Sequence, residues 1–248
     1  MAGSFAVLLY FGNDLYHKMP PIPAKVITPD GTVLFTEQEI RDGQNVWQST
    51  GGQQMGSVWG HGAYVAPDWS ADWLHRESVW LLDHWAKQQY GKPYADLSAP
   101  DQAALQAKLQ AEMRTNTYKP DVGDLVVSTD RAAAIRAVAG HYVQLFSDAP
   151  EQAKLREAYA IPGNVLRDAE RRHQLTGFFF WAAWACAANR PGETVSYTQN
   201  WPPEPLVANT PTGSSVLWSV VSFVLLLAGI GALAWYNAVL KGREDIDG

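Results

Sequence analysis

The most uniform hydrophobic stretch of the chain lies near its C-terminal end. Residues 216–240 contain no charged side chain in 25 positions. A helix of that length measures about 37 Å, enough for a hydrocarbon core of roughly 30 Å. Trp218 and Trp235 stand 17 residues apart, near where the two aromatic belts of a membrane lie. The pattern predicts a transmembrane helix at residues 213–241 and a short tail at 242–248.

Basic residues predict the orientation of this helix. No lysine or arginine occurs between Pro191 and Leu240, whereas Lys241 and Arg243 follow directly. Lysine and arginine favour the cytoplasmic side of a membrane. We therefore expect the tail in the cytoplasm and the preceding part of the chain on the outer side.

A shorter apolar stretch opens the chain. It covers residues 2–11 and ends at Gly12-Asn13-Asp14, too few residues to span a bilayer. No basic residue precedes Lys18, as a signal peptide would require. We expect residues 1–19 to be the outer half of a transmembrane helix whose beginning is absent. A short hydrophobic leader is the alternative.

Residues 20–212 have the pattern of a mainly α-helical soluble domain. Thr36 and Glu39 are spaced as a capping box and open one helix, while Trp69, Trp73 and Trp80 share one face of another. A hairpin is predicted at 24–35, with Val26 and Ile27 opposite Val33 and Leu34, and a short strand at 124–128. The predicted helices cover residues 36–49, 69–90, 98–115, 130–146, 150–160 and 164–188.

A proline-rich segment at residues 200–211 joins this domain to the membrane helix. It carries Trp201 among several prolines and has little helix or strand potential. A stiff segment of this kind is suited to lie against a neighbouring membrane protein, and a plain connector is the alternative.

Charge and cysteine content exclude several classes of protein. The chain carries 19 basic and 25 acidic side chains, a net charge of −6, which argues against a nucleic-acid partner. The single cysteine excludes an intramolecular disulfide framework, a zinc site built on several cysteines, and a c-type haem, which needs C-x-x-C-H. The six histidines all lie outside residues 216–240, so that helix cannot ligate a haem within the bilayer.

Candidate chemistry in the chain is sparse. His75-Arg76-Glu77 could supply a base, although a structural ion pair is the favoured interpretation, and a hydrolase built on His75 and Glu77 is the least favoured function. Cys186 lies in an apolar run and is expected to be a core residue. The glycine-rich loop at residues 60–68 could present backbone carbonyls to a hard cation such as Ca²⁺, although a simple turn is the commoner use.

Several long motifs resemble the N-terminal region of quinol-dependent, single-chain nitric oxide reductases. They are QNVWQSTGG at 44–52, GSVWGHGAYVAPDW at 56–69, ADWLHRE at 71–77, FFFW at 178–181, NRPGET at 189–194 and NWPPEPL at 200–206.

The resemblance implies a cytochrome c-like fold that has lost its haem. It also implies that apolar side chains fill the vacated pocket, and Trp47, Met55, Val58 and Trp59 are the candidates. The Gly-Ala-Tyr stretch of related two-subunit enzymes donates carbonyls to a calcium ion at the interface with the catalytic core. The matching positions here are Gly62 and Tyr64, which would form only part of that site.

The resemblance also implies the rest of the enzyme. A twelve-helix catalytic core, absent from these residues, would hold haem b, haem b3 and non-haem iron and reduce two NO to N₂O with a quinol. This chain would be a fragment or one part of a split enzyme, with no catalytic residue of its own. Its partners would be that core, membrane lipid and a second copy of the chain. It would lie in a bacterial inner membrane with its soluble domain in the periplasm.

One alternative of another class remains open. The chain could be a free-standing, membrane-anchored periplasmic binding module without an enzymatic partner. A twelve-helix protein encoded downstream or nearby would distinguish the first hypothesis from this one.

Overall fold

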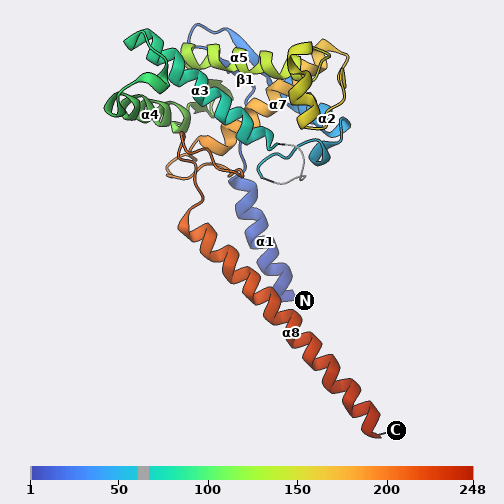
Figure 1. Cartoon of the computed structure of the whole chain (residues 1–248). Helices are drawn as coiled ribbons and strands as arrows, with labels where there is room; N and C mark the ends of the chain where they lie inside the picture. The colour runs from blue at the N-terminus through green and yellow to red at the C-terminus, as the bar shows by residue number, and fades with distance from the viewer. Residues whose placement is uncertain (1, 61–66, 248) are drawn as a thin grey trace. The chain divides into compact units, whose positions relative to one another are not determined.

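The computed structural model describes residues 2–60 and 67–247, in two units, Met1–Thr210 and Pro211–Gly248 (Figure 1). Short 3₁₀ helices lie at Gly52–Gln54, Tyr94–Asp96 and Pro150–Gln152. The strands are β1 (Lys25–Ile27), β2 (Val33–Thr36), β3 (Tyr118–Lys119) and β4 (Asp124–Val126). The α-helices are α1 (Ala2–His17), α2 (Glu37–Ser49), α3 (Trp69–Tyr90), α4 (Ala99–Arg114), α5 (Thr129–Leu145), α6 (Ala153–Ala158), α7 (Ala169–Ala187) and α8 (Gly213–Asp247).

The first helix is longer than its apolar stretch. α1 continues through Gly12, Asn13 and Asp14 to His17, and Pro20 follows shortly afterwards. Leu8 and Leu9 are exposed on it. An exposed apolar helix is compatible with a membrane segment, and its assignment to the outer half of a transmembrane helix stays a prediction.

A small mixed sheet joins two distant parts of the chain. The strand order is β2-β1-β4-β3. β1 and β2 form the predicted hairpin, although Val26 lies opposite Phe35 and an irregularity follows before Ile27 pairs with Val33. β4 pairs in parallel with β1, so that Val26 and Leu125, both buried, lie side by side in the sheet.

Helix α7 forms the centre of the soluble domain. It contacts α2, α3, α4 and α5, and Figure 1 shows it passing among them. Its residues from Leu175 to Ala187 are all buried, as expected for a helix that is apolar on every side. Phe179 lies between Trp69 and Phe178, with ring centroids 5.2 and 6.2 Å away. The core is therefore largely aromatic, and it joins α3 to α7.

Local signals fix the ends of the helices. Thr36 and Glu39 make the reciprocal bonds of a capping box at α2, and Asp68 caps α3, which ends at Gly91 in the left-handed conformation. Ser98 caps α4 and Ser128 caps α5. The mainly helical prediction is confirmed. α7 begins at Ala169 rather than near residue 164, because Asp168 is its N-cap.

The second unit contains the helix α8. Its stretch Gly213–Lys241 has a mean hydropathy of 2.4 over 29 residues, and within the described residues it is the one helix long and apolar enough to cross a membrane. Phe223, Leu225 and Leu233 are exposed on it. It is a candidate membrane anchor. The helix extends past Leu240 into the charged tail and ends at Asp247.

Candidate docking site at the glycine loop and the strap

Residues 57–60 and 67–68, which we call the loop stem, flank the glycine-rich loop. They are held together by the buried carboxylate of Asp68. Ser57 and Asp68 form a β-bridge, and the Ser57 hydroxyl donates to Asp68 Oδ2 at 2.8 Å. The backbone N–H groups of Gly60 and Ala71 donate to the same carboxylate at 2.6 and 2.9 Å, and the Ser70 hydroxyl donates to it as well. One side chain therefore caps α3 and ties together both ends of the loop.

The two residues proposed for calcium lie within this loop. Gly62 and Tyr64 fall outside the described residues, so their role stays a prediction. The described stem holds Gly60 and Pro67 at the two loop ends, where Ser57 N–H donates to Pro67 O at 3.0 Å.

The four side chains expected to fill a former haem pocket all pack on the core. Val58 is buried, and Trp47, Met55 and Trp59 are partly buried against the core. The Trp47 ring lies 5.6 Å from the Phe178 ring, and its Nε1 donates to Gly56 O at 3.2 Å. Trp59 donates from Nε1 to Ala182 O at 2.9 Å. Trp47 thus packs on α7 and is bonded to Gly56, whereas Trp59 is bonded directly to the backbone of α7.

These residues do not fit a covalently bound haem. Cys186 is the only cysteine, it is buried within α7, and burial raises the pKa of its thiol well above the usual value. Attachment of a c-type haem needs two cysteines and a histidine in one motif. Over residues 2–60 and 67–247, no group of three histidine, cysteine or acidic side chains is placed to hold a metal ion.

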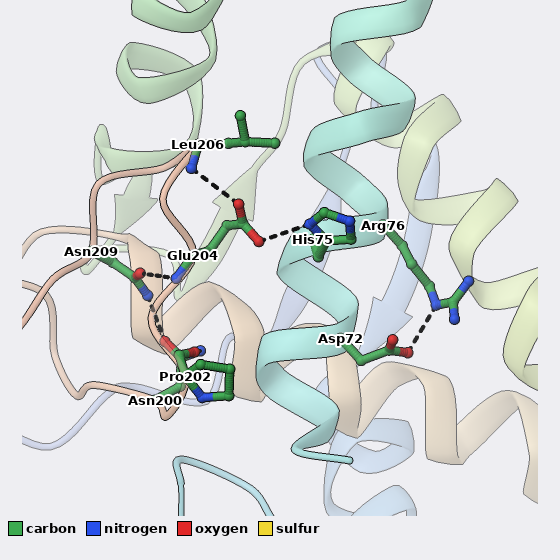
Figure 2. Close-up of polar contacts among 8 residues, drawn as sticks. All are labelled: Asp72, His75, Arg76, Asn200, Pro202, Glu204, Leu206 and Asn209. Atoms are coloured by element: carbon green, nitrogen blue, oxygen red, sulfur yellow. Dashed lines mark hydrogen bonds and ion pairs between the residues drawn. The ribbon is translucent and has the colours of Figure 1, made fainter. Parts of the chain in front are cut away.

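Residues 200–209, which we call the strap, are anchored by buried polar side chains (Figure 2). Glu204 accepts from the Leu206 N–H at 3.0 Å and contacts His75 Nδ1 at 3.0 Å. Asn209 accepts from the Glu204 N–H at 2.8 Å and donates to Asn200 and to Cys186 O. The strap is therefore fixed both to α3 and to the end of α7 rather than being a loose connector.

Gly60 is needed where the strap meets the loop stem. Its φ is +78°, in the left-handed region, and an added Cβ would lie 2.8 Å from Trp201 Cβ. The Trp201 side chain itself is 67% exposed. The stem and the strap thus meet at Gly60 and Trp201, and the Trp201 side chain is exposed there.

The His75-Arg76-Glu77 triplet is divided among three different partners. His75 contacts Glu204, Arg76 Nε donates to Asp72 at 2.8 Å, and Glu77 accepts from Arg131 Nε at 2.8 Å (Figure 2 shows the first two pairs). His75 and Glu77 therefore engage separate groups, and Arg76 and Glu77 each form an ion pair, as expected from the sequence. Sequence reasoning missed Glu204 and Arg131, because each lies far along the chain from its partner.

His141 on α5 gives the domain a predicted pH dependence. Burial lowers its pKa to about 4, and the nearby Arg76 guanidinium adds to this, while Asp72 opposes it. The unfolded chain takes up this proton near pH 6.5. The free energy of unfolding is therefore expected to fall as the pH drops from about 6.5 to about 4.

Urea titrations of the full chain at several pH values will measure this effect. His141→Gln should flatten the dependence in that pH window, and His17→Gln, on the exposed end of α1, should leave it unchanged. An equally steep dependence in His141→Gln would assign the effect to other groups.

Comparison with known proteins decides the family. The family model for the NorB cytochrome c-like domain of nitric oxide reductase matches residues 23–203. The chain belongs to the NorB family of nitric oxide reductases. No curated protein matches the chain.

The part matched to the NorB domain begins before β1 and ends within the strap. It includes the loop stem, the aromatic core and His75 but ends one residue before Glu204, and α1 and α8 lie outside it. The family resemblance stated from the sequence motifs is confirmed, and the matched residues include the loop stem and Trp201 but not Glu204 or Asn209.

Proposed function

We propose that the chain is the non-catalytic N-terminal part of a quinol-dependent nitric oxide reductase. It caps and stabilises a twelve-helix core that holds haem b, haem b3 and non-haem iron. The whole enzyme converts two NO and one quinol into N₂O, water and quinone. The observation that supports this proposal most strongly is the family match over residues 23–203. The only cysteine of the chain is buried in the core.

The packing around Trp47 and Trp59 supports a structural role. Both indoles pack on the aromatic side chains of α7 and donate to backbone carbonyls. Electrons are therefore proposed to reach the core from quinol within the membrane, without a redox group in this domain.

The face formed by the loop stem and the strap is proposed to contact the core. The Trp201 side chain is exposed there, while the strap beneath it is fixed by Glu204 and Asn209. In this proposal the carbonyls of Gly62 and Tyr64 contribute to a calcium site at the interface, and the core supplies a carboxylate.

The membrane placement follows from α8 and from the distribution of charge. We propose that α8 crosses the bacterial inner membrane, with its lipid-facing side chains in the bilayer and Lys241 on the cytoplasmic side. The soluble domain would then lie in the periplasm, and a homodimer is part of the same proposal.

Docking through Trp201 can be tested in the assembled enzyme. We expect Trp201→Ala to weaken retention of the core about 30-fold, since truncating a central interface tryptophan costs roughly 2 kcal/mol or more. Affinity purification from membranes through a tag on this chain, with haem b absorbance as the readout for the core, measures retention. Quinol-driven NO reduction in the purified complex gives a second readout.

Val122→Ala is the matched control, because Val122 is also exposed but lies in the turn between β3 and β4. It should retain the core fully. Equal retention by Trp201→Ala would reject the docking face. A wild-type chain that never retains a haem-containing core would reject the proposed function and favour the free-standing binding module.

A further inference from the structure

We propose that the cavity between α4 and the start of α5 is a binding site for a small oxyanion, a phosphate or a carboxylate group. The cavity measures about 730 Å³ and is lined by the second half of α4, by β3, by the end of β4 and by the first turn of α5. It is separate from the loop stem and the strap, and its lining includes the cations Lys108, Lys119 and Arg131.

Arg131 is the buried group of this site. Its side chain is 3% exposed, and Nε donates to Glu77 Oε1 at 2.8 Å. The other oxygen of Glu77 accepts from Trp73 Nε1 at 2.8 Å, so the carboxylate is engaged on both sides. Arg131 Nη2 is buried and has no hydrogen-bond partner among the described residues. An unpaired buried donor is costly, and this guanidinium therefore has capacity for a further acceptor.

The charge of the lining favours an anion over a water molecule as that acceptor. Three cations and one acid, Glu112, line the cavity, and Glu77 behind Arg131 offsets one positive charge. A positive balance remains in a chain whose net charge is −6. Lys108 is also oriented, because its Nζ lies 3.9 Å from the centroid of the Trp85 ring.

The N-terminal end of α5 adds to the positive potential of the cavity. Ser128 lines the cavity and caps the helix, with its hydroxyl accepting from the Arg131 N–H at 3.1 Å. The N-terminal end of a helix of 17 residues carries a partial positive charge and free N–H groups. Asp130 in the same turn is engaged elsewhere, by Trp85 Nε1 at 2.8 Å. A buried arginine, two lysines and the first turn of a helix thus line one cavity.

The test is a titration of the full chain in detergent with inorganic phosphate and, separately, with malonate. Isothermal calorimetry and the unfolding midpoint are the readouts, and sodium chloride at matched ionic strength is the reference. We expect saturable binding and a raised unfolding midpoint with at least one of the two oxyanions. The one that binds more tightly identifies the preferred group. Responses that merely follow ionic strength overturn the proposal.

Variants at the rim keep the test independent of folding. Lys108→Gln and Lys119→Gln change exposed side chains, and each should weaken binding at least about tenfold through loss of a charge-assisted hydrogen bond. Lys154→Gln, on α6, is the matched control and should bind like the wild type. Unchanged binding in both rim variants would overturn the assignment of the cavity. None of these outcomes depends on the docking of a catalytic core.

Discussion

Glu77→Ala should lower the free energy of unfolding of the soluble domain by roughly 3–5 kcal/mol, the usual effect of leaving a buried charge without its partner. Glu77 and Arg131 are both almost fully buried, and Glu77 also accepts from the Trp73 indole. Removing the carboxylate leaves the guanidinium and the indole N–H inside the core without their acceptor. Urea unfolding of the full chain in detergent, followed by tryptophan fluorescence, measures the loss.

Two variants serve as comparisons for Glu77. Glu37→Ala breaks an exposed pair with Arg41 on α2 and should change stability by at most about 0.5 kcal/mol. The double variant Glu77→Leu with Arg131→Met should recover most of the lost stability, because well-packed apolar side chains often replace a buried ion pair. A loss below about 1 kcal/mol in Glu77→Ala would mean that the pair contributes little.

Gly43→Ala should destabilise the domain by about 3 kcal/mol, at the upper end of the usual cost of overpacking. Gly43 lies in α2 where that helix contacts α7. An added Cβ would lie 2.0 Å from the Gln174 backbone oxygen and 2.8 Å from Phe178 Cβ. Since the nearest atom is backbone, one of the two helices has to move. The unfolding midpoint in urea measures the effect.

Gly140→Ala is the control for this prediction. Gly140 also lies inside a helix, α5, but an added Cβ there meets nothing within 4 Å. Alanine should stabilise the protein at this position by about 0.5–1 kcal/mol, because glycine loses more backbone entropy on folding. Opposite signs at the two glycines are expected, and a stabilising Gly43→Ala would contradict the close packing of α2 on α7.

The ends of α2 and α3 could be predicted from the sequence because their signals are local. Thr36 and Glu39 are three residues apart, and their capping bonds form within one helical turn. Asp68 and Gly91 likewise mark both ends of α3 through their own backbone preferences. The burial of the second half of α7 followed from composition alone, since Phe178-Phe179-Phe180-Trp181 leaves no polar face.

The contacts that build the candidate sites could not be predicted in the same way. Glu77 and Arg131 are 54 residues apart, and His75 and Glu204 are 129 residues apart. Their side chains meet only because α3, α5 and the strap pack together. No spacing in one sequence encodes such a pairing, and β3, which is two residues long, gives no periodic signal at all.

The parallel pairing of β1 with β4 has a consequence for how the domain is completed during synthesis. β1 stands in the interior of the sheet, yet its partner β4 is made about a hundred residues later. Until then the hairpin of β1 and β2 keeps one edge open, and open strand edges attract other chains. Pairings this distant also form slowly. Until residues 124–126 have been made, this edge of β1 is therefore open to pairing with other chains.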